Sequence, residues 1–492
     1  MKRRFYTNID IDTVTTPFLN RVSEEENVSE ELLYPFVDIY KDTLITDVLL
    51  NNFCQYSATK SEIWNDYADK YEQKTENGVE VDYRELYRGI YKLNAEYSID
   101  PFDVWLRRLR QIGLSGWLSI RMNDCHSPDE TTFFARSDFF YEAREKGWMI
   151  GDKYGYFRYC FDYSVPEVRK KMLDYIKEQL WRYDPDGLEL DFQREITCFD
   201  IENCPDRIEI MTDFVRSVRE MTEERGRQLG HKIRLGVRLM RDIEQNLIYG
   251  FDIVNWAKEG LVDLVCYTPR WETSDSDMPS EEWEEQVKGV ELAAGIEILC
   301  CRPSVETRCT PAVVRGYAVR YLSRGADSMY LYNYYIDPGN IDSRAKYIQQ
   351  VNETAGSLEE AIKHPYRHAV TFQDISPRGY GRWKPLPIKL KSGENAAFDI
   401  DIGKARDNAS AELILGFTSG SPENISVFAN GDAADFTETE YPSAEPDRRI
   451  YYGPDGTVYY RAPVKPADKY RVELKAAADA ELVYAEIGIY QA

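Results

Sequence analysis

The sequence predicts an α/β chain in which a closed (β/α)8 barrel, the TIM-barrel architecture, is followed by a small all-β sandwich domain. The chain has 492 residues, more than one hydrophobic core usually organises, so two domains are expected. Short apolar runs alternate with amphipathic helical stretches up to about residue 355, which indicates a parallel sheet with crossover helices. Beyond about residue 366 only short alternating runs with turns remain.

Eight strands are expected in the first part, at 5–10, 46–52, 117–123, 187–192, 233–239, 263–268, 296–302 and 328–333. Eight parallel strands favour a closed barrel over an open doubly wound sheet. The expected helices are 30–40, 101–112, 166–182, 206–229, 243–260, 280–293, 311–324 and 343–354. Several begin with Pro or an acidic turn and end at Gly, as helix capping favours. We therefore assign residues 1–365 to the barrel, as the catalytic domain.

The two longest connections follow the second and third strands, at 53–100 and 124–164. Both leave the C-terminal end of a strand, where barrel enzymes build their sites, so a walled cleft is expected there. The remaining residues, 366–492, are assigned to a β-sandwich accessory domain because their short alternating runs have sandwich spacing.

Charge and composition exclude several classes of partner. Asp and Glu number 85 against 61 Lys and Arg, a net charge of −24, which repels nucleic acid and anionic membrane surfaces. The start has no apolar run that resembles a signal peptide, and the nine cysteines show no CxxC pair, so a cytoplasmic protein with reduced thiols is expected. The four histidines lack metal-ligand spacing, so neither a metal nor another cofactor is predicted. The oligomeric state stays open.

The sharpest local pattern is Asp184-Pro-Asp-Gly-Leu-Glu-Leu-Asp-Phe-Gln-Arg-Glu195. Alternate residues of a strand share a face, so Glu189 and Asp191 both point into the barrel. Asp191, nearer the C-terminal end, would stand at the floor of the cleft, where a nucleophile or general acid/base is needed. Glu189 lies one layer deeper, and an internal structural carboxylate paired with arginine is the simpler interpretation of it.

This stretch, with Phe161-Asp-Tyr-Ser-Val-Pro-Glu-Val-Arg before the helix and Tyr183-Asp-Pro-Asp-Gly-Leu-Glu-Leu-Asp-Phe after it, resembles glycoside-hydrolase-like barrels that read "(N/H)PEVR … YDVDG(I/F)xxD". Ser119-Ile-Arg-Met-Asn-Asp124, followed by Cys125-His126, and Asn8-Ile-Asp10 also look like an uncharacterised branch of that group. The resemblance covers about residues 5 to 340. It implies the barrel fold and a carbohydrate substrate, with Asp191 ending the fourth strand inside the site.

The second carboxylate is harder to place. Glycoside hydrolysis needs two carboxyl groups about 5 to 9.5 Å apart. The resemblance implies an acid at the end of strand five, six or seven, but those ends read Arg238, Thr268-Pro-Arg270 and Arg302. Asp191 with Asp124 is the first pairing considered, and Asp191 with Glu195 or Glu272 the second.

Arginines at the ends of different strands form the other unusual feature, namely Arg121, Arg194, Arg238, Arg270 and Arg302. Guanidinium groups bind carboxylates in pairs of hydrogen bonds, so a ring of them suggests an anionic sugar such as a uronic acid. The alternative is that they neutralise the acids of the barrel, Asp10 among them.

Further candidate ligands of a sugar come from other strand ends. His126 could act as an acid or base near neutral pH, although a lone His more often only hydrogen-bonds. Asn123 is a further candidate for substrate binding, and Tyr267, Tyr332 and Asn333 could form a stacking wall, with core packing as the alternative.

Three functions fit this pattern. The first is a glycoside hydrolase acting on an oligosaccharide, with Asp191 as its central carboxylate. The second is a sugar-acid lyase or isomerase that uses Asp124, His126 or a Tyr for proton abstraction beside arginines. The third is a non-catalytic saccharide-binding protein.

Overall fold

The structure, a computed structural model, describes residues 3–10, 14–71, 74–76, 79–81, 83–126, 136–269, 274–297, 299–302, 305–308, 310–339, 341, 343–371, 386–439 and 456–490. Its first part is the predicted closed barrel. Eight parallel strands follow one another around it in the order β1-β12-β9-β8-β7-β6-β5-β2. They are β1 (Phe5–Ile9), β2 (Asp47–Phe53), β5 (Ser115–Arg121), β6 (Gly187–Asp191), β7 (Arg234–Met240), β8 (Leu264–Thr268), β9 (Glu291–Glu297) and β12 (Ser328–Tyr332).

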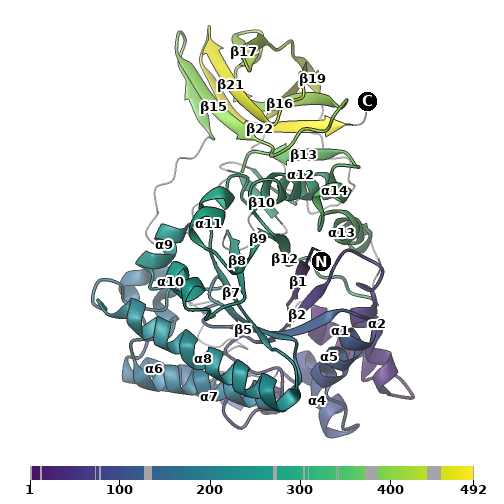
Figure 1. The fold of residues 1–492 in the computed structure, drawn as a ribbon, viewed down its shortest axis with the longest axis vertical. Coiled ribbons are helices and arrows are strands. Elements are labelled where there is room, and N and C mark those ends of the chain that lie inside the picture. The colour runs from purple at the N-terminus through teal and green to yellow at the C-terminus, as the bar shows by residue number, and fades with distance from the viewer. Residues whose placement is uncertain are drawn as a thin grey trace.

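Helices surround these strands (Figure 1). They are α1 (Thr16–Val22), η2 (Glu30–Leu33), α2 (Pro35–Asp38), α3 (Tyr67–Tyr71), α4 (Arg84–Ala95), α5 (Pro101–Gln111), α6 (Asp138–Lys146), η3 (Asp152–Tyr159), α7 (Pro166–Arg182), α8 (Arg207–Leu229), α9 (Ile243–Ile248), α10 (Ile253–Lys258), α11 (Ser280–Gln286), α12 (Pro311–Leu322), α13 (Ser343–Thr354) and α14 (Leu358–Ala361). The long connection after β2 carries α3, α4 and the hairpin of β3 (Lys74–Glu76) and β4 (Val79–Val81), and the one after β5 carries α6 and η3.

One strand lies elsewhere than predicted. The expected helix at 280–293 ends as α11 at Gln286, and the seventh barrel strand is β9, Glu291–Glu297. The run expected at 296–302 instead contributes β10 (Leu299–Arg302), which pairs antiparallel with β11 (Val305–Arg308) outside the barrel. A Glu-Leu-Ala-Ala run has helical propensity, but all of β9 after Glu291 is buried, so tertiary packing decides.

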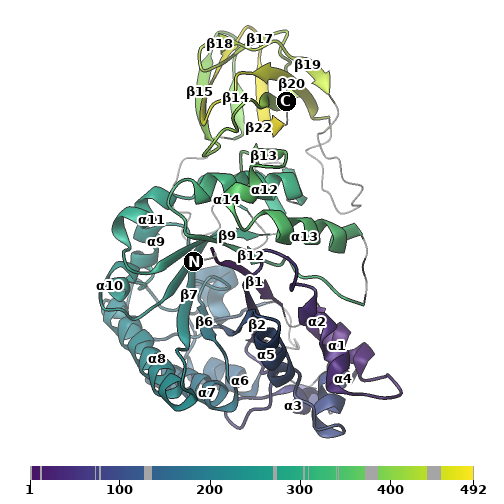
Figure 2. The same cartoon turned by 45° about the vertical axis from the view of Figure 1, so that its right-hand side comes forward.

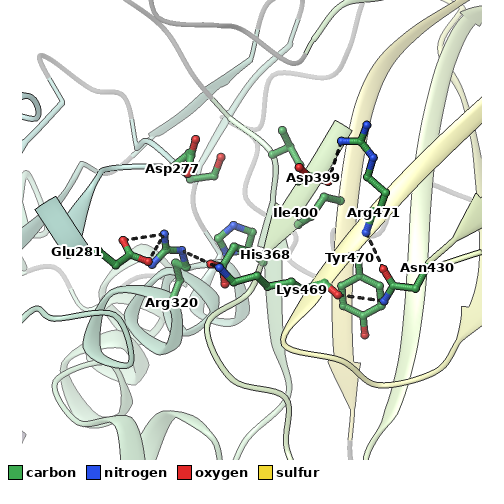
Figure 3. A pocket seen from close by; sticks show the side chains of 13 residues that line it. Asp277, Glu281, Arg320, His368, Asp399, Ile400, Asn430, Lys469, Tyr470 and Arg471 are labelled. Carbon is green, nitrogen blue, oxygen red and sulfur yellow. Dashed lines mark hydrogen bonds and ion pairs between the residues drawn. The ribbon is translucent and has the colours of Figure 1, made fainter. Parts of the chain in front are cut away.

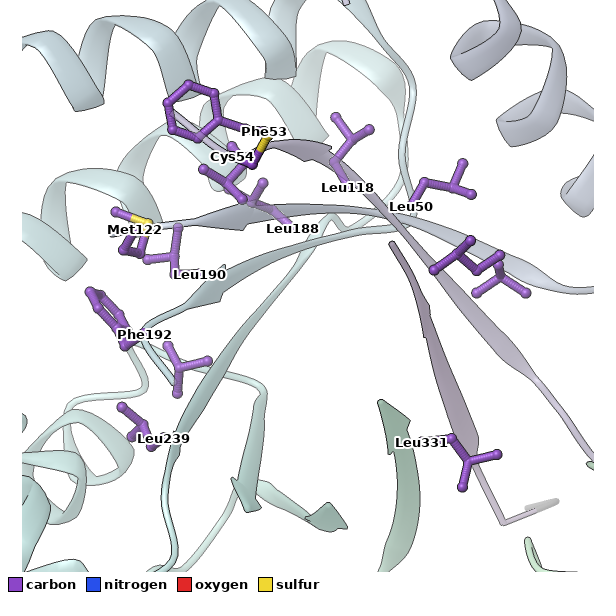
Figure 4. Packing of buried hydrophobic residues seen from close by; sticks show 14 of the residues in the cluster. Leu50, Phe53, Cys54, Leu118, Met122, Leu188, Leu190, Phe192, Leu239 and Leu331 are labelled. Carbon is purple, nitrogen blue, oxygen red and sulfur yellow. The ribbon is translucent and has the colours of Figure 1, made fainter. Parts of the chain in front are cut away.

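Side chains alternate along each strand, so one set faces the helices and the other faces the barrel interior. Leu188, Leu190 and Phe192 pack with residues of neighbouring strands in the layer between strands and helices (Figure 4). The intervening residues of β6 point into the barrel. A Cβ at Gly187 would lie 2.2 Å from the Trp117 ring, so the lower interior is already filled by that indole. The barrel is therefore a packed core whose polar residues collect in layers.

The second part is the predicted β-sandwich. One sheet has the order β13-β22-β16-β20-β19 with β14 also on β22, and the other has the order β15-β21-β17-β18. The strands are β13 (Tyr366–Ala369), β14 (Ile388–Leu390), β15 (Asn395–Asp401), β16 (Ser410–Ser419), β17 (Ile425–Ala429), β18 (Asp432–Ala433), β19 (Thr437–Thr439), β20 (Val458–Val464), β21 (Lys469–Ala476) and β22 (Ala480–Tyr490). The two sheets enclose a hydrophobic core of their own.

The sandwich stands on the α12 side of the barrel, with β13 next to that helix, as two views agree (Figures 1 and 2). Tyr317 of α12 donates to the carbonyl oxygen of Ala369 over 3.0 Å. Ser276, from the barrel, bonds the carbonyl oxygen of Thr371 over 2.7 Å, and Thr371 donates to Ser274 over 2.7 Å. Among the described helices, none combines the length and apolarity needed to cross a bilayer.

Candidate functional site

The C-terminal ends of four barrel strands contribute carboxylates to one network. Asp191 ends β6, and its side chain points into the barrel beside Arg238, its register partner on β7. The Oδ1 atom accepts from the backbone N–H groups of Gln193 and Arg194, each over 3.0 Å, and from Arg238 Nε over 2.9 Å. Oδ2 accepts from Arg238 Nη2 over 3.2 Å.

This environment differs from the open mouth that the sequence predicted for Asp191. The residue is 1% exposed, and the guanidinium of Arg238 lies directly on it. The reason is the register between β6 and β7, which sets a long cation opposite the carboxylate at the same height of the barrel. Asp191 is thus an oriented acceptor below the surface of the site.

A second carboxylate on the same guanidinium, Glu297, was not predicted from the sequence. It ends β9, so the expectation that no acid ends strands five to seven was wrong. Its Oε1 accepts from Arg238 Nη1 over 3.2 Å, and its Oε2 from Asn333 Nδ2 over 3.4 Å. One guanidinium therefore binds carboxylates from the fourth and the seventh barrel strands.

A second arginine organises the other half of the network. Arg121, at the end of β5, binds Asp10 over 2.6 Å and Asp124 over 3.1 Å. Asp124 is buried and also contacts His126, through both its backbone N–H and its Nδ1 atom. Together these ion pairs hold the pKa of Asp124 well below its ordinary value, against the desolvation that would raise it.

Access to solvent is confined to the outer members of this half. The side chains of His126, Asp10 and Arg194 are 33%, 16% and 13% exposed. Arg194 Nη2 lies 3.2 Å from His126 Nδ1. These three groups present polar atoms where the barrel meets solvent.

Tyr332 joins the two halves. Its hydroxyl accepts from Arg121 Nη2 over 3.3 Å, and the Arg238 Cζ atom lies 3.7 Å from the centroid of its ring. The ring face attracts the guanidinium through its quadrupole. Tyr332 was predicted as a stacking surface for sugar, but in this structure its ring face is occupied by arginine.

Glu189 lies in the layer below. It accepts from Ser119 Oγ over 2.6 Å and from Asn8 Nδ2 over 3.1 Å. Burial, reinforced by the charge of Asp191, raises its pKa to about 7. A carboxyl so enclosed fits the internal structural role that the sequence analysis favoured.

Other predicted site residues lie away from the network. Tyr267 faces the helices, where it stacks on Trp283 with centroids 5.1 Å apart and bonds Ser280 over 2.7 Å, so its place in a stacking wall was wrong. Asn123 is buried, where it bonds the backbone of Phe161 and Thr197. Glu195 is buried, as Asp191 and Glu297 are.

Three predicted residues cannot be placed. Arg270 and Glu272 lie outside the described residues, as does the side chain of Arg302.

Asn333 follows β12 with a positive φ of 66°, a backbone conformation that Asn tolerates and that turns its amide toward Glu297. Within the described residues, no group of three or more His, Cys, Asp or Glu side chains is arranged to hold a metal ion.

No protein-family model matches the chain, and no curated protein matches it. Solved structures do match. An α-L-fucosidase isoenzyme 2 from Paenibacillus thiaminolyticus is 13% identical with a TM-score of 0.41, over 71% of this chain and 48% of that one. A cycloisomaltooligosaccharide glucanotransferase from Paenibacillus sp. is 9% identical with a TM-score of 0.36, over 98% of this chain and 57% of that one.

An α-L-fucosidase isoenzyme 1 from Paenibacillus thiaminolyticus has 13% identity and a TM-score of 0.36, over 94% of this chain and 97% of that one. The chain thus spans about half the length of the first two relatives.

Proposed function

We propose that the chain is a glycoside hydrolase whose site is the carboxylate–arginine network at the C-terminal end of the barrel. The observation that carries this proposal is that Arg238 binds both Asp191 and Glu297. Two carboxylates on one guanidinium lie near each other, and glycoside hydrolysis requires such a pair, about 5 to 9.5 Å apart. Glu297 also supplies the acid at strand seven that the family resemblance calls for.

The hydrogen bonds of the pair suggest separate roles. Asp191 Oδ1 accepts three N–H bonds, whereas Oδ2 accepts one, from Arg238. A carboxylate held this way is an acceptor, so we assign Asp191 as the nucleophile or the stabiliser of an oxocarbenium-like transition state. Glu297 accepts from Arg238 through Oε1 and from Asn333 through Oε2, and we assign it the proton transfer to and from the glycosidic oxygen.

The substrate is proposed to carry a uronic acid, a point that now depends on fewer arginines than the sequence suggested. Arg121 and Arg238 are buried and each already binds two carboxylates. Their positive charges are therefore neutralised by carboxylates of the network. Arg194, partly exposed beside His126, is the described arginine that can reach an anionic substrate from solvent.

The test is reducing-sugar release from a panel of neutral and uronic-acid-containing oligosaccharides. The wild-type chain should hydrolyse at least one member, and Asp191→Asn should lose that activity while its circular dichroism spectrum and melting temperature stay close to wild type. Binding without turnover of any glycan would reject the proposal in favour of a saccharide-binding protein. Full activity in Asp191→Asn would reject the assigned role.

A second candidate, a sugar-acid lyase or isomerase, is favoured by one observation. The His126 ring is a third exposed and contacts the buried carboxylate of Asp124, the arrangement that orients an imidazole for proton abstraction. Arg194 lies close enough to neutralise a substrate carboxylate. An unsaturated or isomerised product formed without incorporation of solvent oxygen would select this reaction over hydrolysis.

A further inference from the structure

A polar cavity of about 600 Å³ lies between the barrel and the sandwich (Figure 3). The barrel contributes Asp277 and residues of α11 and α12. The sandwich contributes residues of β13, of the end of β15 and of the start of β21. The cavity shares no lining residue with the carboxylate–arginine network. Its size falls within the range of about 300 to 1,000 Å³ typical of small-molecule sites.

The walls of this cavity are held in place by ion pairs within each domain and by contacts of Arg320 and Arg324 with Asp401, which cross the domain interface. Arg320 of α12 binds Glu281 of α11 over 3.2 Å and lies 3.7 Å from Asp401 of β15. Lys469 of β21 binds the same Asp401 over 3.0 Å, and Arg324 binds it over 3.1 Å. The two domains thus present a preformed surface, which lowers the entropic cost of binding a ligand.

Two buried residues behind this surface have polar atoms left over. Arg320 is 4% and His368 2% exposed. Arg320 Nε and Nη1 and His368 Nδ1 have no hydrogen-bond partner in the part of the chain that the structure describes. Burial, together with the charge of Arg320, lowers the pKa of His368 to about 4, so its imidazole is neutral near pH 7. Buried polar groups are normally satisfied, and a ligand or ordered water is the usual partner when the protein supplies none.

The charges of the lining are nearly balanced, and this decides the class of ligand. Four carboxylates and three cations line the cavity, namely Asp277, Glu281, Asp399, Asp401, Arg320, Lys469 and Arg471. Most of them pair with one another, such as Arg471 with Asp399 over 3.0 Å. An anionic ligand would be repelled by the carboxylate in excess. An apolar ligand would remove these charges from water without supplying hydrogen bonds. Hydroxyl groups, which both donate and accept, suit such a surface.

We propose that this interdomain cavity is a second binding site, one that takes a neutral saccharide. The carboxylates and the imidazole accept from sugar hydroxyls, while the lysine and arginine side chains donate to them. The site is independent of the proposed hydrolase function, because it would bind glycan whether or not the barrel is catalytic.

The test measures binding of the full chain to an array of neutral and uronic-acid-containing oligosaccharides, with hydrogen–deuterium exchange to locate the bound glycan. The probe variant is Asp277→Ala with Arg471→Ala, one exposed side chain from each wall. Lys391→Ala is the matched control, since Lys391 pairs with Asp479 over 2.8 Å on the exposed surface and lines no part of the cavity. Glu297→Gln reports on the barrel network separately.

Neutral oligosaccharides should protect residues 399–401 and 469–471 from exchange in wild type, Lys391→Ala and Glu297→Gln. The probe variant should lose at least tenfold in affinity and show no protection there. Protection by acidic glycans alone, binding that the probe variant leaves unchanged, or no neutral glycan bound at these residues would each overturn the proposal. None of these outcomes bears on hydrolysis at Glu297, so the two proposals fail separately.

Discussion

The barrel contains ion networks at both ends, and they are built differently. At the lower end, where the strands begin, Arg4 binds Asp47 over 2.6 Å and Arg234 binds Glu291 over 2.7 Å. Two neutral side chains also donate hydrogen bonds to these acids. Trp117 donates to Asp47 and Tyr6 donates to Glu291, each over 2.9 Å. Two acids therefore meet two arginines, and Arg4 also lies 3.8 Å from Glu291, so it contacts both acids.

At the upper end the acids outnumber the arginines. Among the described residues, Asp10, Asp124, Asp191 and Glu297 share Arg121, Arg194 and Arg238, so four carboxylates meet three arginines, and His126 also contacts Asp124. Solvent access alone does not separate the two ends, because a cavity of about 930 Å³ borders the lower one. The difference teaches that the upper network gathers carboxylates from four strands, at the end of the barrel where active sites are found.

Making the same substitution at each end gives the largest expected contrast. Glu297→Gln should reduce turnover by about 1,000-fold, in the range of about 10² to 10⁴ that an acid/base group contributes. Glu291→Gln should leave turnover within about twofold, but it should cost about 1–3 kcal/mol of unfolding free energy, because an NH2 group replaces one carboxylate oxygen and either Arg234 or Tyr6 loses its acceptor. Hydrolysis rates and urea midpoints are the measurements. Equal losses of activity at both ends would abolish the distinction.

Arg238→Lys tests whether the shared guanidinium is what distinguishes the upper end. A lysine keeps the charge but cannot make the two parallel bonds to Asp191 while also binding Glu297. We expect about a 100-fold loss in kcat with little change in KM. Arg234→Lys, which alters one local pair of the lower network, is the control and should retain most activity. Wild-type kcat in Arg238→Lys would contradict the proposed pairing.

Glu189, between the two networks, should make stability depend on pH. Its folded pKa of about 7 lies above the ordinary value of 4.5, so its stabilising contribution is fully present below about pH 4.5 and is lost as the pH rises through 7. Glu189→Gln, which stays neutral, should therefore gain stability relative to wild type between pH 6 and pH 8. Urea midpoints at the two pH values measure this gain. A difference between variant and wild type that stays constant with pH would show that Glu189 does not titrate in this window.

The smallest effect is expected at the link between the two halves of the upper network. Tyr332→Phe keeps the ring under Arg238 but removes the hydroxyl that accepts from Arg121. One neutral acceptor for a charged donor is worth about 1 kcal/mol, so kcat should fall about fivefold. Tyr332→Leu, which removes the ring as well, should lose more. If the two variants have the same kcat, the contact between ring and guanidinium does not position Arg238.

Patterns that depend on local sequence predicted much of the fold. The helix at 166–182 is α7 without a change of boundary, because Pro166 opens it and Tyr183 leaves it in an extended conformation. The strand that ends at Asp191 followed from alternation. The boundary between the domains at 365 stays a prediction, although β13 begins at Tyr366 and pairs with β22.

The features that could not be predicted from the sequence depend on contacts between strands of the barrel. The run Glu291–Glu297 resembles a helix, and only its burial between β8 and β12 makes it a strand, so Glu297 was missed. A usable signal was Gly289, whose positive φ of 79° separates α11 from a strand with the apolar run Leu292–Ile296. The enclosure of Asp191 could not be foreseen either, because it depends on the register that sets Arg238 opposite it.

The place of β22 in the sandwich affects how the protein is synthesised. This strand, Ala480–Tyr490, pairs with β13, β14 and β16. It is therefore a central strand of the larger sheet, and the sheet cannot form without it. On the ribosome the barrel strands all emerge once β12 is complete, at Tyr332, whereas the sandwich has to wait for the last of its strands. A ribosome stalled before residue 480 should therefore carry a closed barrel followed by an unfolded, protease-sensitive tail.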